Sequence, residues 1–203
     1  VVEYKREGYD MFEKMIEKEV EYPVSAQQGL ENKTYISYNV AMPAGVSVVE
    51  SWGLNIVTQV LLEAAGAPLK EALLKEKIGE VINGNYESSI LQPVLGISAD
   101  NANVSDKDRF VLTIEKNLKE IIEKKIDRKA LQASINRAEF KLREADYGGM
   151  SKGLIYALSC LDTWLYNDND PFSTLELTKI FDELKANLET SFYEDLIQKY
   201  ILD

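Results

Sequence analysis

Few residues of this chain have the types and spacing that catalysis needs. The 203-residue sequence contains no histidine and one cysteine, Cys160. Zinc sites in proteins are built mainly from histidine and cysteine, so no zinc site is expected within the chain. A catalytic triad with a histidine base cannot be built from these residues either. Because Cys160 lies in an apolar run, we predict a buried and inert thiol.

Two groups of residues between 148 and 154 resemble catalytic or binding motifs only in part. Ser151 and Lys152 are neighbours, as in serine–lysine catalysis, but no further residue marks Ser151 as a nucleophile. Gly148 and Gly153 have the glycine spacing of a phosphate-binding loop. Leu154 stands where that loop requires a lysine, so the match fails.

Acidic residues offer two further candidates. Glu139 and Glu144 could act as an acid–base pair. Arginine and lysine side chains surround them on the same predicted helix, which favours ion pairing instead. Residues 167–170 (Asn-Asp-Asn-Asp) carry oxygen ligands but lack the glycine and the final glutamate of a calcium loop. We therefore predict a solvent-exposed turn there.

Composition limits the kinds of partner. The net charge of −11 disfavours nucleic acid and anionic membrane surfaces as partners, because both would repel the chain. No apolar run approaches the roughly 18–20 residues that cross a bilayer, and the first ten residues lack the order of a signal peptide. A single cysteine suits a reducing compartment, so a cytoplasmic or organelle-interior location is expected.

Four segments show strand patterns. Residues 18–24 alternate in polarity, with Pro23 indicating a sheet edge, and residues 34–42 place Ile36, Tyr38, Val40 and Met42 on one face. Residues 81–87 and 89–99 complete the set, and Pro93 predicts a bulge or an edge position in the last of them.

Helical patterns occupy most of the remaining chain. Ser47 with Glu50, and Ser173 with Glu176, form capping boxes at the starts of two helices, and Asp127 can cap another. Residues 154–165 are apolar on nearly all sides, which predicts a central, buried helix. Strands that do not alternate regularly with helices predict an α+β fold, a mostly antiparallel sheet covered by several helices. Residues 1–17 are predicted to be a linker or partial helix, and residues 18–203 a single domain.

Six segments in order along the chain resemble the presequence-protease branch of the insulinase-like zinc metallopeptidases (the M16 family, subfamily C). The resemblance covers almost the whole chain, and its specificity comes from the order of the segments. They are residues 33–39 (KTYISYN), 67–74 (APLKEALL), 86–93 (YESSILQP), 136–144 with Gly153 and Leu154, 164–172, and 197–202 (IQKYIL).

The resemblance implies that this chain is a domain that accompanies the catalytic domain and is not catalytic itself. Members of this family are long chains of four related domains with a LuxS/MPP-like metallohydrolase fold, arranged in two halves around a chamber. The zinc motif, His-x-x-Glu-His, lies in the first domain, whereas this chain matches the second. The resemblance therefore implies a non-catalytic domain of a zinc-dependent metalloendopeptidase that degrades unfolded peptides. Zinc would belong to the parent enzyme, this fragment would bind none and be inactive alone, and its partners would be the parent's other domains and unfolded peptides.

Two alternatives stay open at this point. One is a zinc-less structural or binding subunit of the same superfamily, in which this domain would look the same. The other is an independent helical adaptor, which the limits of the chain disfavour because they suit a domain cut from a longer protein.

One part of the domain is a candidate for substrate binding. The resemblance implies that a strand edge of the second domain anchors peptides away from the zinc, and the matching positions are Gly84, Asn85 and Tyr86, with Gly66 close by in the fold. Glycine at position 84 would let a peptide backbone approach closely, and an exposed edge can add a strand. The alternative is that Asn83 and Gly84 only form a turn.

Overall fold

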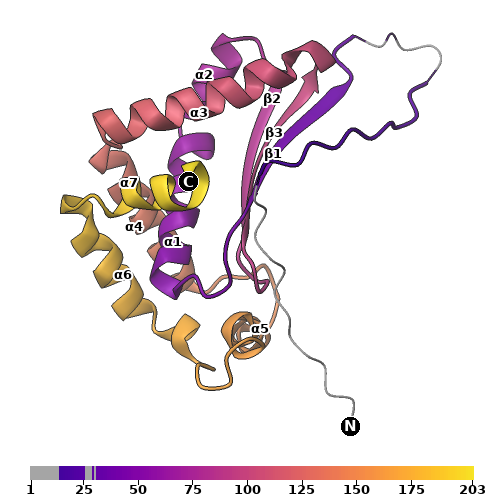
Figure 1. Ribbon diagram of the computed structural model, residues 1–203. Helices are drawn as coiled ribbons and strands as arrows, with labels where there is room; N and C mark the ends of the chain where they lie inside the picture. The colour runs from indigo at the N-terminus through magenta and orange to yellow at the C-terminus, as the bar shows by residue number, and fades with distance from the viewer. Residues whose placement is uncertain (1–13, 26–28, 30) are drawn as a thin grey trace.

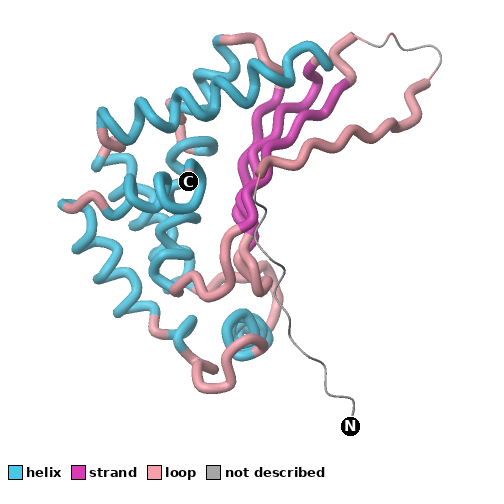
Figure 2. Tube along the Cα trace, in the orientation of Figure 1, coloured by secondary structure: helices cyan, strands magenta, loops and turns pink. Residues whose placement is uncertain are grey.

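The computed structural model describes residues 14–25, 29 and 31–203, and within them it has the predicted α+β architecture. Three strands form an antiparallel sheet in the order β1–β3–β2, and the helices pack on one side of it (Figures 1 and 2). Most of the predicted linker over residues 1–17 lies outside the described residues. The strands are β1 (Thr34–Ala41), β2 (Val81–Glu87) and β3 (Val94–Ala102).

Helices make up most of the remaining described chain. Short 3₁₀ or π segments, labelled η, extend or connect several of them. In chain order the elements are α1 (Val48–Thr58), η1 (Gln59–Glu63), α2 (Pro68–Lys75), η2 (Val104–Asp106), α3 (Lys107–Lys124), α4 (Arg128–Glu144), α5 (Lys152–Trp164), η3 (Ser173–Leu175), α6 (Leu177–Ala186), η4 (Asn187–Glu189), α7 (Phe192–Ile197) and η5 (Gln198–Leu202). None of the helices within residues 14–25, 29 and 31–203 combines the length and the apolar character that crossing a membrane requires.

The face of the sheet that meets the helices is the apolar face predicted for residues 34–42. Ile36 pairs with Ala99 of β3, and Tyr38 pairs with Ile97. Ile36, Ile97 and Ala99 are buried, and Tyr38 packs against the same core. Because side chains alternate along a strand, the opposite face carries mainly polar residues, and none of the helices in the described residues covers it (Figure 1).

The prediction that Pro93 marks a bulge or an edge position within a strand is wrong. The strand β3 starts at Val94, one residue after the proline, and it is the central strand of the sheet. Residues 89–92 form bends before it. Proline has no N–H to donate, so it is tolerated just before the strand. There its carbonyl oxygen accepts a hydrogen bond from the Met42 N–H at 2.8 Å.

The strand predicted over residues 18–24 is also wrong. The segment is irregular, and its side chains are mostly exposed. Its contacts are made by side chains: the Tyr22 hydroxyl donates to the Lys33 carbonyl oxygen, and the Tyr22 ring packs edge-on against Tyr35. Alternating polarity therefore did not produce a strand here, because no neighbouring strand pairs with the segment within the described residues.

Helix starts follow the predicted caps in two cases and depart from them in a third. Ser47 and Glu50 form the capping box of α1, and Asp127 caps α4 by accepting hydrogen bonds from the first turn. Ser173, which also stands three residues before a glutamate, does not cap a helix. Instead α6 begins at Leu177, and the buried Ser173 hydroxyl has no hydrogen-bond partner.

The largest departure concerns α5, which the sequence places at the centre of the core. Only Cys160 is buried on this helix, as predicted for that thiol, and most of the other apolar side chains are exposed. The packing partner of α5 is chiefly η3, at the lower end of the molecule in Figure 1. An apolar helix thus lies outside the main core.

Candidate peptide-binding edge

Strand β2 lies at an edge of the sheet, so one side of its backbone has no partner strand among the described residues. The hydrogen bond from Met42 to Pro93 shows which residues of β3 point toward β1. In an antiparallel pair, successive residues point their backbone N–H and C=O groups to opposite sides. From Pro93, every second residue (95, 97 and 99) therefore points toward β1, and residues 94, 96, 98 and 100 point toward β2.

The pairing of β2 with β3 then shows which residues of β2 direct their backbone N–H and C=O groups toward β3 and which direct them outward. Residues 94, 96, 98 and 100 pair with residues 87, 85, 83 and 81, so these four residues of β2 bond inward to β3. Ile82, Gly84 and Tyr86 consequently direct their backbone N–H and C=O groups outward. Of the three predicted site residues, Gly84 and Tyr86 present backbone groups at the open edge, whereas Asn85 is paired to Gly96.

Gly84 is required by packing on the other side of the strand. It lies within β2, so the alternative that Asn83 and Gly84 form a turn is wrong. A Cβ atom added at Gly84 would lie 2.9 Å from the Cβ and 3.1 Å from the Cγ of Leu62, which is buried on η1. Glycine therefore lets η1 pack closely on β2. Gly66 lies just after η1 with φ of +73°, in the turn before α2.

Asn85 belongs to the polar face of the sheet. Its side-chain oxygen and that of Asn39 flank Gly96, where an added Cβ would lie 3.0 Å from the Asn39 Oδ1. Asn39 in turn donates from Nδ2 to the Ser37 hydroxyl at 3.0 Å. Amide side chains thus border β2 on the face away from the helices, where they can neighbour an added strand.

Tyr86 faces the helices, and its side chain anchors the strand. The Tyr86 hydroxyl donates to the Ser51 Oγ of α1 at 3.2 Å. Burial raises the pKa of the Tyr86 hydroxyl, and the hydrogen bond with Ser51 offsets part of this rise. A phenol held in this way cannot contact a peptide at the edge, so only the Tyr86 backbone is available there.

The helix that holds Tyr86 is itself fixed by Glu50. The Glu50 carboxylate accepts hydrogen bonds from Lys199 Nζ at 2.9 Å, from the Tyr200 hydroxyl at 3.0 Å and from the Ser47 hydroxyl at 2.8 Å. Burial raises the pKa of the Glu50 carboxyl, but these hydrogen bonds outweigh it and hold the pKa at about 2. A charged carboxylate therefore joins the start of α1 to η5.

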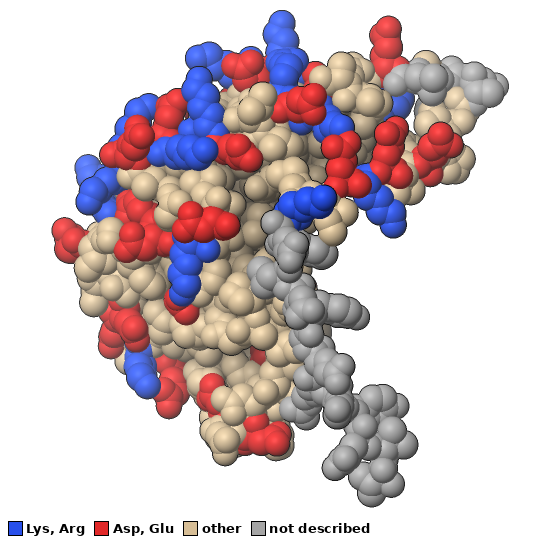
Figure 3. Space-filling view, in the orientation of Figure 1, with Lys and Arg blue, Asp and Glu red and all other residues tan. Residues whose placement is uncertain are grey.

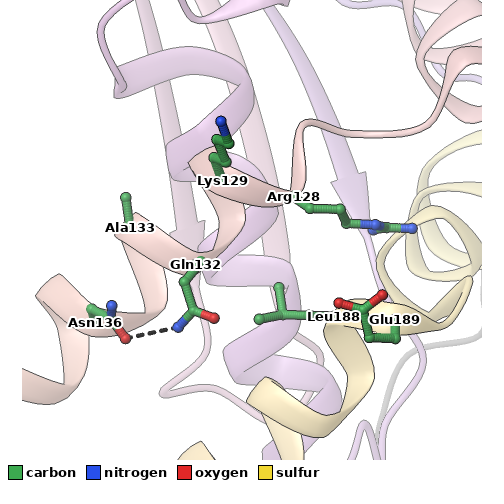
Figure 4. A pocket seen from close by; sticks show the side chains of 7 residues that line it. All are labelled: Arg128, Lys129, Gln132, Ala133, Asn136, Leu188 and Glu189. Atoms are coloured by element: carbon green, nitrogen blue, oxygen red, sulfur yellow. Dashed lines mark hydrogen bonds between the residues drawn. The ribbon is translucent and has the colours of Figure 1, made fainter.

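Neither metal ligands nor a deep cavity accompany the edge in the described part of the chain. No group of three or more histidine, cysteine, aspartate or glutamate side chains there could hold a metal ion. With no histidine in the sequence and Cys160 buried, the described residues do not present a donor set that fits zinc. A hollow of about 350 Å³ lies between α4 and η4 (Figure 4). Its Arg128 is already bound to the Thr190 carbonyl oxygen and to Glu194, and its Gln132 to Asn136.

Sequence reasoning missed three residues that support the edge. Leu62 explains the glycine at position 84, Ser51 anchors Tyr86, and Tyr200 completes the Glu50 cluster. The capping box identified Glu50 itself. The contact with Tyr200 joins residues 150 positions apart, which no local pattern could reveal.

Two curated relatives match nearly the whole chain. Protein HypA of Clostridium perfringens is 34% identical over 192 residues, which is 95% of this chain and 20% of that protein. Presequence protease 1 of Arabidopsis thaliana, designated chloroplastic/mitochondrial, is 27% identical over 196 residues, which is 94% of this chain and 18% of that protein. The chain thus spans about a fifth of the length of these relatives. No family model matches it.

Solved structures show the same fold. A Bordetella pertussis protein assigned as a zinc protease superposes with a TM-score of 0.65 at 16% identity, covering 82% of this chain and 85% of that one. An inactive peptidase domain from Bordetella parapertussis gives a TM-score of 0.61 at 13% identity, with the same coverage. The fold of these structures agrees with the sequence match to presequence protease 1, and the chain is a presequence-protease-like domain of the M16 (insulinase-like) peptidase family.

Proposed function

We propose that this chain is the second, non-catalytic domain of a longer polypeptide, the parent chain, which is a zinc-dependent metalloendopeptidase that degrades unfolded peptides. The observation that carries the proposal is the alignment of 94% of this chain with 18% of a presequence protease. The sequence, which has no histidine, supplies no His-x-x-Glu-His motif. The domain would form part of the chamber wall and hold the catalytic domain in place.

The proposal predicts a division of activity between the parent chain and this domain. The parent chain is expected to contain an upstream His-x-x-Glu-His motif and to cleave an unfolded peptide until a chelator removes its zinc. The isolated 203-residue chain is expected to cleave nothing, with or without added zinc. Peptide cleavage by both preparations, measured by mass spectrometry, checks this. Zinc-dependent cleavage by the isolated chain would overturn the domain assignment.

A second candidate is a structural or binding subunit that has lost zinc. The observation that favours it is the likeness to an inactive peptidase domain. In this case the parent chain would lack the motif and would bind unfolded peptides without cleaving them. The same cleavage assay, with peptide binding measured alongside, separates the two candidates.

Strand β2 is the proposed anchoring edge for substrate. The outward N–H groups of Ile82, Gly84 and Tyr86 could bond to an added peptide strand, and main-chain bonding suits an enzyme that accepts varied unfolded sequences. Cross-strand neighbours on the open face would be Asn83 and Asn85, whose polar amides tolerate many side chains. This role uses the backbone of the edge and leaves the Tyr86 side chain on Ser51.

Amide hydrogen exchange tests this edge residue by residue. In the isolated chain, the amides of Gly84 and Tyr86 should exchange fast, and a saturating unfolded peptide should slow them about tenfold or more. The amides of Asn83 and Asn85 provide the internal control, because they already bond to β3 and should be slow in both states. Unchanged exchange at Gly84 and Tyr86 with peptide bound would exclude the edge as the binding place.

A reducing interior, cytoplasmic or organellar, is the proposed location. The single cysteine is buried and free, which suits a compartment without disulfide formation. The Arabidopsis relative is designated chloroplastic/mitochondrial, and organelle interiors belong to this class of compartment.

A further inference from the structure

One helix of the domain carries an apolar stripe on its outer side. Leu154, Leu158 and Leu161 of α5 and Leu165, the residue that caps its C-terminal end, are 52%, 50%, 36% and 45% exposed. We call these four residues the leucine stripe. Trp164, which is 49% exposed, lies beside it. The leucines are spaced 4, 3 and 4 residues apart, so they lie along one face of the helix.

The opposite side of α5 already holds the helix on the domain. Cys160 is buried there, and the Ser159 carbonyl oxygen accepts a hydrogen bond from the Thr174 hydroxyl at 2.9 Å. The Thr163 hydroxyl donates to the Asp170 carbonyl oxygen at 2.8 Å. Because these contacts fix the rotation of α5, the leucine stripe points away from the domain.

The chemistry of the stripe matches a permanent helical partner. Leucines spaced 4, 3 and 4 residues apart recur about every 3.5 residues on average. This is the spacing of the apolar residues by which two helices pack side by side. Lys152 and Asp162 are the charged residues of α5, whereas charged side chains crowd over α3 in Figure 3. Interfaces that stay buried are depleted in charge, and an apolar surface left open would promote aggregation.

We propose that the leucine stripe of α5 packs against a helix in another domain of the parent chain, an inference that rests on the proposed function. About four fifths of the length of the matched relatives lies outside the region that this chain spans, so a longer polypeptide has ample chain to supply that helix. Two other occupants could cover the stripe, a second copy of this chain or a substrate peptide, and the labelling experiment distinguishes them from a helix of the parent chain.

Thiol labelling measures whether the stripe is covered. Leu158→Cys is introduced into the isolated chain and into the parent chain, and maleimide attachment at position 158 is followed by mass spectrometry. Labelling in the parent should be about tenfold slower or more, because burial limits access to the thiol. Leu112→Cys on α3 is the matched control, since Leu112 is an exposed leucine (63%) that lies outside the leucine stripe, and its rate should be the same in both proteins. The unsubstituted protein gives the background from the buried Cys160.

The outcomes distinguish the covered stripe from the proposed function. Equal labelling at position 158 in both proteins would refute the covered stripe, and zinc-dependent cleavage by that same parent would leave the proposed function standing. Protection in the isolated chain that grows with concentration, together with a dimer in sedimentation velocity, would assign the stripe to a second copy. Protection of the parent only after peptide is added would assign it to substrate. A parent reading frame without further domains would remove both proposals.

Discussion

Replacing Gly84 with valine is expected to lower the free energy of unfolding by about 3 kcal/mol, the upper part of the range for overpacking a core. The new Cβ would lie 2.9 Å from the Leu62 Cβ, and Leu62 is 2% exposed, so it has little room to move. Gly84→Ala introduces the same Cβ and should cost about 2 kcal/mol. Urea denaturation of the isolated chain measures both.

A double substitution identifies the cause of the loss. Gly84→Ala combined with Leu62→Ala should cost less than the sum of the two single changes, because the shortened Leu62 makes room for the new methyl group. Asn85→Ala, one residue away on the open face, is the matched control and should change stability by about 0.5 kcal/mol or less. Wild-type stability in Gly84→Ala would disprove the close packing of η1 on β2.

The packing of Gly84 also decides how the edge can be tested. A valine at position 84 would disturb the sheet from its helix-facing side, so a loss of peptide binding in that variant would not report on the edge. The amide exchange of Gly84 and Tyr86 avoids this difficulty, because it observes the outward backbone groups of the unaltered strand.

Glu50→Gln is expected to lower the free energy of unfolding at pH 7 by about 2 kcal/mol, after allowance for solvent screening of the exposed Lys199. Glutamine keeps an acceptor at the third position of α1, so the capping box can persist. The substitution removes the negative charge of the carboxylate, to which the Lys199 Nζ and the Tyr200 hydroxyl donate hydrogen bonds at 2.9 and 3.0 Å. The substitution therefore isolates the charge from the cap.

The contribution of Glu50 should depend on pH with a definite sign. The pKa is lowered from 4.5 to about 2 in the folded protein. A lowered pKa stabilises the folded state above the unfolded value, and this stabilisation is lost as the pH falls from about 4.5 toward 2. The difference between wild type and Glu50→Gln should thus shrink between about pH 7 and pH 2.5 in urea denaturation. Glu123→Gln on the exposed side of α3 controls for net charge, and a difference independent of pH would contradict the assignment.

Local patterns predicted the elements whose partners are also local. The alternation in residues 34–42, the capping residues Ser47 and Asp127, and the limits of β2 are confirmed because each depends on side-chain direction or on a bond within one turn. Ser173 shows the limit of such patterns: the same spacing as a capping box did not start an α-helix there, and Ser173 is instead the first residue of the 3₁₀ segment η3.

For the candidate site too, some features could be predicted from the sequence and others required the structure. The sequence identified Gly84, Asn85 and Tyr86 as a group, but period-two alternation alone does not say which of them faces a partner strand. That followed from the pairing of Met42 with Pro93, which sets the direction of the backbone groups along β3 and, through the register, along β2. The reason for a glycine at position 84 required its contact with Leu62.

The sequence by itself determined the family, the α+β class, the lack of histidine and the apolar character of residues 154–165. Only the tertiary structure decided that β2 is an edge, that Gly84 and Tyr86 direct backbone groups outward, and that α5 turns its leucines to the surface. The physical reason is that hydrophobicity measures the tendency of a side chain to leave water, whereas burial depends on which surfaces the folded chain brings against it.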